Sequence, residues 1–489
     1  MTKPSDRLDL ARAALRDSQA ERAAALCRAV LADEPGQAAA RQLLAEALLM
    51  LDRPDEALAI ADEARAGGDS VGLMTLAGRI LAKLERYEEA AAVQEQAYAL
   101  APERPDVITN LGVALFELDR FGPALELFRK AFRLAPQDAR VVANLGNFLD
   151  FAGTLDLSLA AYEAAASLSP HDREIRSNHG MALLRAGRFE QGWPLFESRR
   201  RQRDPAEEAG IALLPAPLDG LDLQGKRVLV FHEQGFGDSL QFLRYVPLLA
   251  ARGAQVIVRM PPALKRLAES VAGAAEVISG YGVPPDLDFV SPLMSLARCF
   301  GTTLESVPLD VPYLHPPVAS LARGQAAVAD LPHPRIGLVW AGSPRGGLDR
   351  RRSLPFERIL PLLARPAGFV SLQLGPAGAQ WAPPSGCAAL DPSGALVDFA
   401  ETAGLVKALD LVITVDTSVA HVAGALGKPV WILNRFDACW RWLRDRNDSP
   451  WYPTARLFHQ PRPGDWDSVV AAVAQALRHL PSDVSQGII

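Results

Sequence analysis

The chain of 489 residues is long enough for two to four domains, each with a core of its own. Its 51 basic and 57 acidic side chains give a net charge of -6, which offers no electrostatic footprint for nucleic acid. The four cysteines form neither a CxxC pair nor a zinc-site spacing, as is typical of a reducing compartment. The polar start and the lack of any apolar run of about 18 residues predict a cytoplasmic protein without membrane insertion.

The first 200 residues repeat with a period of 34. Each unit contains two blocks of helical apolar spacing around a short turn. Glycines, small residues and unit-ending prolines recur at that period, namely Gly78, Gly112, Gly146 and Gly180; Ala90, Ala124, Ser158 and Gly192; and Pro102, Pro136 and Pro170. The period and the pattern predict tetratricopeptide (TPR) helix–turn–helix repeats over residues 1–201.

Stacked repeats of this kind form an α-solenoid whose concave groove usually binds peptide or protein. Asn110, Asn144 and Asn178 occupy one equivalent position in three successive units. Because a side-chain amide both donates to and accepts from an extended backbone, an asparagine ladder would bind an acceptor protein independently of its sequence. The alternative is local hydrogen bonding within ordinary repeats. Residues 202–224, charged and then rich in proline, are expected to form a linker.

Beyond Gly225, apolar strands alternate with helices of about 10–15 residues, a pattern typical of parallel α/β layers. A proline-rich passage separates two such series. We therefore expect two Rossmann-like lobes, at 225–320 and 330–482, followed by a flexible tail at 483–489. Ligands of open α/β sheets bind at the carboxyl ends of the strands, so the strand-end loops are the candidate sites.

The strongest of these loops lies in the segment LVITVDTSVAHVAGALGKPVWIL. An apolar strand ends at Asp416, and Thr417 and Ser418 open a helix. The N–H groups and the dipole at a helix start suit a diphosphate. His421 follows Thr417 by four residues, which places both on one helix face. The alternative is that these polar residues only cap the helix while His421 packs.

A second candidate loop lies in VLVFHEQGFGDSLQFLRY. Gly235 and Gly237 allow a ligand to approach the backbone closely. Asp238 is the candidate general base for an acceptor hydroxyl, and His232 and Glu233 are the alternative bases. The alternative role of Asp238 is structural, as a helix cap. The spacing is not GxGxxG, and no acidic residue ends the second strand. A dinucleotide dehydrogenase is therefore disfavoured.

A third candidate is the turn at 340–343 with the polar loop at 349–353, whose arginines can neutralise a leaving diphosphate. The alternative is a solvated basic loop. Farther on, clustered aromatic side chains either stack on a sugar or base or close a core; these are Trp440, Trp442, Trp451 and Tyr452.

These segments, together with GLVWAGSP, RRSLPF, SLQLGP, DFAETAGLV and WRWLRDRNDSPWYPTARLF, resemble the TPR-containing bacterial glycosyltransferases. The catalytic domains of that family are similar to ADP-heptose lipopolysaccharide heptosyltransferases and, distantly, to O-GlcNAc transferase. The resemblance implies a GT-B fold and inverting transfer from a nucleotide-sugar without metal or other cofactor. It implies that Asp238 is the base. It implies that Asp416, Thr417, Ser418 and His421 hold the donor phosphates. The other donor-side candidates in these loops are Gln234, Gly235, Gly237, Trp340, Gly342, Ser343, Arg352 and Gln373.

The sequence also departs from that family. Relatives often have Asn at the position of Ser343 and Lys at that of Leu374, and their Asn-Asp-Arg loop reads Leu348-Asp349-Arg350 here. The departures leave the donor open.

Three functions follow as expectations. The first is transfer of a sugar to a Ser or Thr hydroxyl of a protein captured by the repeats, with flagellin a plausible acceptor by resemblance. The second is transfer to a lipid-linked or polysaccharide glycan, which predicts a membrane-facing basic or amphipathic patch that the sequence lacks. The third is a TPR adaptor with a non-catalytic GT-B domain.

Overall fold

The computed structural model describes residues 3–17, 19–66, 71–200, 204–344 and 349–480. The chain divides into two compact units, Met1–Ile175 and Arg176–Ile489. The predicted tail at 483–489 and Leu348 lie outside the described residues.

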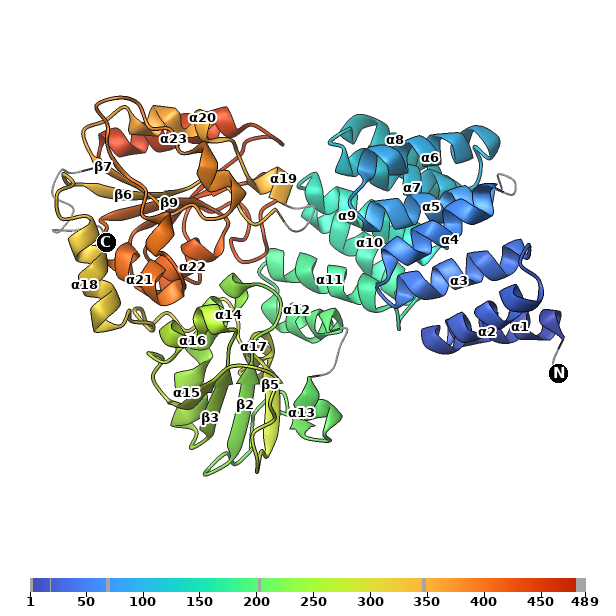
Figure 1. Ribbon diagram of the computed structural model, residues 1–489, viewed down its shortest axis with the longest axis horizontal. Coiled ribbons are helices and arrows are strands. Elements are labelled where there is room, and N and C mark those ends of the chain that lie inside the picture. Colours follow the sequence, from blue (N-terminus) through green and yellow to red (C-terminus); the bar gives the residue numbers. More distant parts are fainter. Residues whose placement is uncertain (1–2, 18, 67–70, 201–203, 345–348, 481–489) are drawn as a thin grey trace. The chain divides into compact units, whose positions relative to one another are not determined.

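The first unit consists of antiparallel helix pairs, drawn from blue to teal in Figure 1. Helix starts at residues 4, 38, 71, 105 and 139 repeat the predicted period of 33 or 34 residues. The helices are α1 (Pro4–Arg16), α2 (Ala20–Asp33), α3 (Ala38–Met50), α4 (Pro54–Ala66), α5 (Val71–Lys83), α6 (Tyr87–Leu100), α7 (Pro105–Glu117), α8 (Phe121–Leu134), α9 (Ala139–Phe151) and α10 (Leu155–Leu168).

The periodic glycines mark the points where the paired helices are closest. A Cβ at Gly112 would lie 2.9 Å from the Phe128 ring, and one at Gly146 would lie 3.3 Å from the Ala161 Cβ. Any larger side chain would therefore push the second helix away from the first. The turns of the four pairs from α3/α4 to α9/α10 each contain one residue in the left-handed region, as in Asp119, where φ is 59°.

The second unit begins at Arg176, inside α11 (Arg173–Arg185), and continues with α12 (Phe189–Phe196). The predicted repeat boundary at residue 201 is therefore not the boundary between compact units. Phe189, Trp193 and Phe196 are buried in the core of the α/β unit, which explains why α12 belongs to it. The predicted linker at 202–224 also contributes regular structure, namely α13 (Pro205–Glu208) and β1 (Ala212–Leu213).

The first sheet of this unit has five parallel strands in the order β1-β5-β2-β3-β4. Its other strands are β2 (Arg227–Phe231), β3 (Gln255–Arg259), β4 (Ala274–Ile278) and β5 (Phe289–Pro292). The helices that follow its strands are α14 (Phe236–Phe242), α15 (Val246–Ala251), α16 (Pro262–Ala268) and α17 (Leu296–Cys299). Val228, Leu229 and Val230 of β2 are fully buried, as expected for a central strand covered on both faces.

The second sheet has six parallel strands in the order β11-β10-β9-β6-β7-β8. They are β6 (Arg335–Val339), β7 (Gly368–Ser371), β8 (Ala388–Leu390), β9 (Leu411–Val415), β10 (Val430–Asn434) and β11 (Ala455–His459). Helices α20 (Phe356–Ile359) and α23 (Trp466–Arg478) cover one face, and α21 (Phe399–Lys407) and α22 (Ser418–Ala425) cover the other (Figure 1). The remaining helices are α18 (Val318–Ala327) and α19 (Asp349–Arg352).

The strand orders identify where ligands of such sheets bind. In the first sheet the order reverses between β2 and β5, and in the second between β6 and β9. These are the topological switch points, where loops on neighbouring strands leave in opposite directions and open a crevice. The loops concerned follow Phe231, Pro292, Val339 and Val415.

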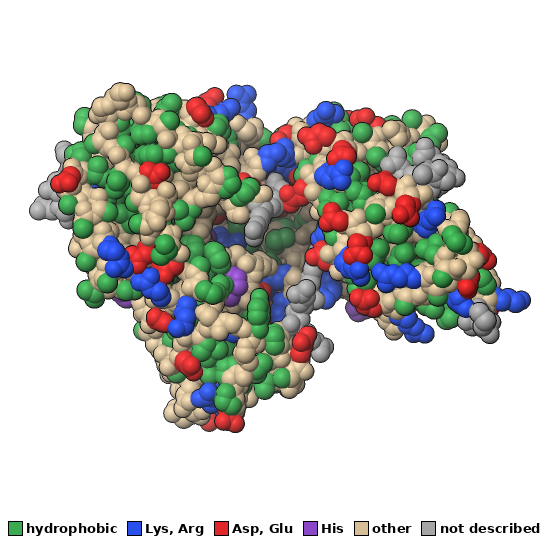
Figure 2. All heavy atoms as spheres, in the orientation of Figure 1, with side chains coloured by type: hydrophobic (Ala, Val, Ile, Leu, Met, Phe, Trp, Pro, Cys, Tyr) green, Lys and Arg blue, Asp and Glu red, His purple; other side chains and the backbone are tan. Residues whose placement is uncertain are grey.

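On the visible face of each unit, acidic and basic side chains are interspersed (Figure 2), which agrees with the near-balanced composition. None of the helices within the described residues combines the length and the apolar composition needed to cross a membrane.

Candidate functional site

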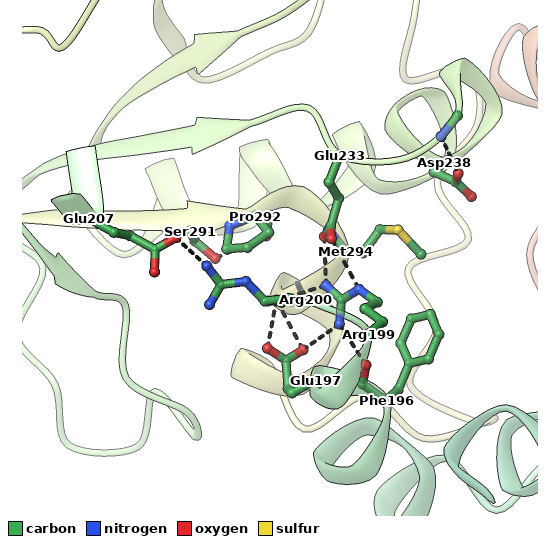
Figure 3. A network of polar contacts seen from close by, with 12 residues as sticks. Phe196, Glu197, Arg199, Arg200, Glu207, Glu233, Asp238, Ser291, Pro292 and Met294 are labelled. Atoms are coloured by element: carbon green, nitrogen blue, oxygen red, sulfur yellow. Dashed lines mark hydrogen bonds and ion pairs between the residues drawn. The ribbon is translucent and has the colours of Figure 1, made fainter. Parts of the chain in front are cut away.

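The loop after β2 is fixed by a buried ion-pair cluster, shown in Figure 3. The guanidinium of Arg199 donates to both carboxylate oxygens of Glu233, at 2.6 and 3.1 Å, and to Glu197 at 2.8 Å. Glu233 also accepts a hydrogen bond from the Met294 N–H, beyond the end of β5. Glu233 therefore ties the loop after β2 to the loop after β5, so its carboxylate is engaged structurally and is a poor candidate for the base.

The rest of this loop turns the chain into α14. Gln234 has a φ of 58° in the left-handed region, and Gly235 is the residue before the helix. The Gly235 N–H donates to Asp238 Oδ2 at 2.8 Å. Asp238 thus caps the helix, which is the structural role expected as its alternative.

Asp238 has a second partner, which the sequence did not indicate. Its Oδ1 forms an ion pair with Arg441, 203 residues farther along the chain. Arg441 also donates to the Gln241 side chain at 2.8 Å and lies over the Trp440 ring at 4.3 Å. Burial disfavours the charged form of Arg441, but Asp238, Cys439 and Asp416 together outweigh this effect and raise the pKa of this arginine.

Helices α14 and α22 touch at this point. A Cβ on Gly237 would lie 2.6 Å from His421 Cδ2, so only glycine allows the two helices to be this close. The GFGD loop after β2 and the DTS loop after β9 therefore meet, each at a switch point of its sheet. Two of the predicted loops are therefore neighbours in the fold.

At the start of α22, Thr417 occupies the N-cap position. Its side chain makes no capping hydrogen bond among the described residues, and its hydroxyl lies 3.0 Å from the Thr414 hydroxyl instead. Asp416 contributes its carbonyl oxygen, which accepts from Arg352 Nη1 at 3.2 Å. The alternative role of Thr417, as a helix-capping side chain, is therefore not what the structure shows. Asp416, Thr417 and Ser418 are all partly exposed.

His421 is packed rather than open to a ligand. Its side chain is buried, its Nδ1 lies 2.9 Å from the Tyr452 hydroxyl, and its ring stacks on Trp442 at 5.4 Å. Burial, with the charges of Arg441 and Arg244, lowers its pKa well below the ordinary value, so the ring is neutral. The imidazole thus faces the contact between α14 and α22, and the sharing of phosphate oxygens with Thr417 stays a prediction.

Two further predicted donor residues lie inside the second lobe. Trp340 is fully buried, stacks on Trp381 at 5.9 Å and donates from Nε1 to Gln380. The Gln373 side chain accepts from the N–H groups of Trp340 and Ala341, at 3.1 and 2.9 Å. The side chains of Trp340 and Gln373 thus hold the loop after β6 and do not face a ligand.

The arginine predicted to neutralise phosphate lies over this loop. A Cβ on Gly342 would come within 2.4 Å of Arg352 and of Asp349, which form an ion pair at 3.1 Å. The Gly342 N–H donates to Ser353 at 2.9 Å. Gly342 is therefore required for the close approach of Arg352, which reaches Asp416. Ser343 is exposed at the end of the loop.

A second arginine that the sequence did not identify is Arg244, in the short turn that follows α14. It is buried and donates to the carbonyl oxygen of Trp451 at 2.6 Å, and it lies over the rings of Tyr313 and Tyr452. The aromatic cluster of the sequence closes a core around it and is buried: Trp440, Trp442, Trp451 and Tyr452. In the sequence, Arg244 stands between Phe242 and Tyr245 in QFLRYVP, and these flanking aromatic residues were the only local signal.

The three asparagines of the predicted acceptor ladder are divided between the two compact units. Asn110 and Asn144 are partly exposed on α7 and α9 of the first unit, and Asn178 is on α11 in the second unit. The Asn144 amide donates to the Arg140 carbonyl of its own helix at 2.9 Å, which is the local bonding of the alternative interpretation.

Comparisons with known proteins identify the repeats. A family model described as "Anaphase-promoting complex, cyclosome, subunit 3" matches residues 16–97, and one described as "Tetratricopeptide repeat" matches residues 81–147. The N-terminal helix pairs are thus tetratricopeptide repeats, as predicted.

One curated relative extends beyond the repeats. Protein FlbA of Caulobacter vibrioides is 29% identical over 323 residues, which are 60% of this chain and 53% of that protein. The chain spans about half the length of this relative.

Solved structures with similar folds are TPR proteins. They include TTC0263, a thermophilic TPR protein of Thermus thermophilus (21% identical, 37% of this chain and 100% of that chain, TM-score 0.35). They also include PilF of Pseudomonas aeruginosa (22% identical, 40% of this chain and 90% of that chain, TM-score 0.32).

Proposed function

We propose that this protein is a nucleotide-sugar-dependent glycosyltransferase that transfers a sugar to a Ser or Thr hydroxyl of a protein held by its TPR repeats. In this proposal the α/β unit binds the donor and performs the transfer without a metal. The resemblance of the C-terminal segments to that class of enzymes supports it, with the GT-B fold as the finer assignment of the two parallel sheets. Flagellin is a plausible acceptor on the same resemblance.

The observation that carries the proposal is the meeting of α14 and α22. The tight contact between Gly237 and His421 brings a carboxylate, Asp238, next to the start of α22. A helix start favours phosphate, and two arginines, Arg352 and Arg441, lie at the same loops. A proton acceptor and a site for a leaving diphosphate are the two parts that metal-free transfer needs.

Donor binding would rest on the start of α22. The diphosphate would accept hydrogen bonds from the backbone N–H groups at this helix start. Thr417 occupies the N-cap position, but its side chain makes no capping hydrogen bond among the described residues. The Arg352 side chain, which holds the Asp416 carbonyl, adds a cation on the side of the loop after β6. His421 would act by packing α22 against α14 and not through its imidazole nitrogens.

Asp238 is the base of the proposal, and His232 is its competitor. Both oxygens of Asp238 are engaged, by Gly235 and Arg441, so accepting a proton requires one of these contacts to give way. His232 Nδ1 lies 2.7 Å from the Ser239 hydroxyl, and burial lowers the pKa of His232, which keeps the ring neutral and able to accept a proton.

The first experiment measures thermal unfolding of the full chain with UDP, GDP, ADP, TDP, CMP and their common sugars. A ligand at about 100 times its dissociation constant stabilises the native state by roughly 2.7 kcal/mol. The shift should disappear in Arg352→Gln, which removes the cation beside the Asp416 carbonyl, and persist in Asp330→Ala, an exposed control on the same unit. If no nucleotide changes the unfolding temperature, the adaptor function replaces the transferase.

A second experiment separates the two candidate bases. Transfer from the donor that the first experiment identifies is measured in Asp238→Asn and in His232→Gln, alongside nucleotide binding. We expect Asp238→Asn to bind the nucleotide and to lose turnover by at least a hundredfold, and His232→Gln to retain most of it. Full turnover in Asp238→Asn with none in His232→Gln would reassign the base.

A third experiment tests acceptor capture. Replacing Asn110, Asn144 and Asn178 together by alanine should weaken the affinity for the acceptor protein and leave hydrolysis of the donor unchanged. Equal acceptor affinity in the triple variant and the wild type would remove the ladder from the proposal.

A further inference from the structure

The Asp238 carboxylate is engaged on both of its oxygens. Its Oδ2 accepts from the Gly235 N–H at 2.8 Å, and its Oδ1 pairs with Arg441. The side chains of Asp238 and Arg441 are only 15% and 11% exposed. In Figure 3 the Asp238 carboxylate lies apart from the Arg199 cluster, and its cationic partner is Arg441. While this pair is closed, a proton on Asp238 would leave the guanidinium buried without a counter-charge.

The remaining contacts of Arg441 leave it able to hold an anion. Its Nε donates to the Gln241 side chain at 2.8 Å, and its Nη1 donates to the Cys439 thiol at 3.0 Å. A thiol is a weak acceptor, and a guanidinium has more N–H groups than these contacts and the ion pair occupy. A phosphoryl oxygen is a stronger acceptor than the thiol, because it is anionic and fits the planar fork.

Arg441 also lies beside α22, at whose start the proposed function places the donor diphosphate. The charge of Arg441 interacts with Asp416, just before this helix, and with His421 on it. Trp442, the next residue in the chain, stacks on the His421 ring at 5.4 Å. From the other side, α14 reaches the same imidazole at Gly237. The ion pair with the proposed base therefore stands next to the proposed phosphate position.

A buried ion pair does not open without a replacement, because each charge would then stay buried without compensation. A phosphate group would give Arg441 a new counter-charge as the old one is released, so the guanidinium stays compensated. Asp238 keeps its contact with the Gly235 N–H, which holds the carboxylate at the start of α14. The released oxygen is then open to the hydroxyl of an acceptor.

We propose that Arg441 couples donor binding to the base: the donor's phosphate draws Arg441 away from Asp238 and so releases the carboxylate for the acceptor hydroxyl. This inference rests on the proposed function. Without a donor, the ion pair keeps Asp238 occupied, so the donor binds before an acceptor is activated.

The transfer step follows from this exchange. The released carboxylate accepts the hydroxyl proton while the hydroxyl oxygen bonds to the anomeric carbon of the sugar. The bond from that carbon to the diphosphate breaks, and its electron pair leaves on the diphosphate oxygen, where Arg441 stabilises the charge. When the nucleoside diphosphate departs, the proton passes to solvent and Arg441 returns to Asp238.

The test is a double-mutant cycle on the full chain, measured by calorimetric titration with inorganic pyrophosphate, UDP, GDP, ADP and TDP. The variants are Asp238→Asn, Arg441→Gln and both together, and the control is Arg462→Gln, whose arginine is 81% exposed in the same unit. Asp238→Asn removes the competitor for Arg441, so we expect it to bind these ligands about fivefold more tightly than the wild type. Arg441→Gln should bind them about tenfold more weakly, and the control should match the wild type.

The double variant separates ion-pair exchange from simple repulsion. If Asp238 only repels phosphate, its removal tightens binding equally with and without Arg441. If the ion pair is exchanged, adding Asp238→Asn to Arg441→Gln should change the affinity by less than about twofold. An equal gain in both backgrounds would overturn the proposal, as would the lack of a gain in Asp238→Asn alone.

A second measurement uses the wild type, so it does not depend on the folding of a variant. Carboxyl groups are labelled with a carbodiimide, and the labelled positions are located by peptide mass spectrometry. Labelling of Asp238 should increase when pyrophosphate is present, whereas that of the exposed Asp330 should stay constant. Unchanged or lower labelling of Asp238 would contradict the release of the carboxylate.

The ligand panel keeps the two proposals apart. If the wild type binds none of these ligands, the proposed function fails and this inference fails with it. If the wild type binds a nucleoside diphosphate but the cycle shows no coupling between Asp238 and Arg441, only this inference fails.

Discussion

The buried Arg199 cluster gives the sharpest prediction about the α/β unit. The Arg199 side chain is 3% exposed and pairs with Glu233 and Glu197, whose side chains are 15% and 20% exposed. The change Arg199→Met keeps an unbranched chain of similar length over the Phe196 ring but removes the cation. Two largely buried carboxylates then lose their counter-charge.

Removing one partner of a buried ion pair costs about 3–5 kcal/mol, because the other charge stays buried without compensation. We expect Arg199→Met to lower the free energy of unfolding of the α/β unit by that amount at neutral pH. Equilibrium urea unfolding followed by tryptophan fluorescence measures it, since Trp193 and Trp440 lie in the core of the same unit.

The loss should depend on pH with a defined sign. Burial raises the pKa of Glu233 above its ordinary value of 4.5, although Arg199 opposes this shift. Without Arg199, the pKa rises further. A carboxyl group with a raised folded-state pKa contributes stability below the unfolded value and loses it as pH rises through the folded value. The deficit of Arg199→Met should therefore be smallest near pH 4.5 and should grow above it.

Two variants control this prediction. Arg462→Met removes an exposed arginine and should change the unfolding free energy by less than about 0.5 kcal/mol. Adding Glu233→Gln to Arg199→Met removes the stranded charge and should recover part of the loss. A deficit under about 1 kcal/mol that is equal at pH 5 and pH 8 would refute the buried-charge reasoning.

Two glycine variants test the close contacts. Gly112→Ala places a Cβ 2.9 Å from the Phe128 ring and should destabilise the repeats by about 1–3 kcal/mol in thermal unfolding. Gly122→Ala, in the same repeat, meets open space and should not show this steric loss. Equal effects of the two changes would contradict the close helix contact. Gly237→Ala places a Cβ 2.6 Å from His421 and should both lower the unfolding temperature and weaken nucleotide binding; an unchanged temperature would show that α14 and α22 have room to separate.

Much of the fold could be predicted because its signals are local. The period of 34 residues placed the repeats, since each helix pair is specified by its own apolar spacing and by glycine where the helices touch. The buried strands β2, β3, β6, β7, β9 and β10 were found as continuous apolar runs. Strands β1, β5, β8 and β11 were missed. Of these, β1 and β8 have only two and three residues, and β1, β8 and β11 lie at sheet edges, where the pairing with a neighbour and not an apolar run defines the strand.

For the candidate site, too, local features were predictable and the packing of side chains was not. Strand-end loops were recognised from glycine and polar residues next to apolar runs, and the structure brings two of these loops, with Gly237 and Thr417, to neighbouring helix starts. The sequence alone did not show which side chains turn inward. Trp340 and Gln373 sit in a predicted loop, yet their side chains point into the core of the lobe and hold the loop in place.

Only the tertiary structure decided the ionic partners and the extent of the second unit. Arg441 meets Asp238 across 203 residues, and Arg199 meets Glu233 across 34 residues, through contacts that no local period encodes. Helix α12 has repeat spacing, but its buried aromatic face belongs to the α/β core. Local pattern fixes which face of an element is apolar or charged, whereas the packing of distant elements decides what that face meets.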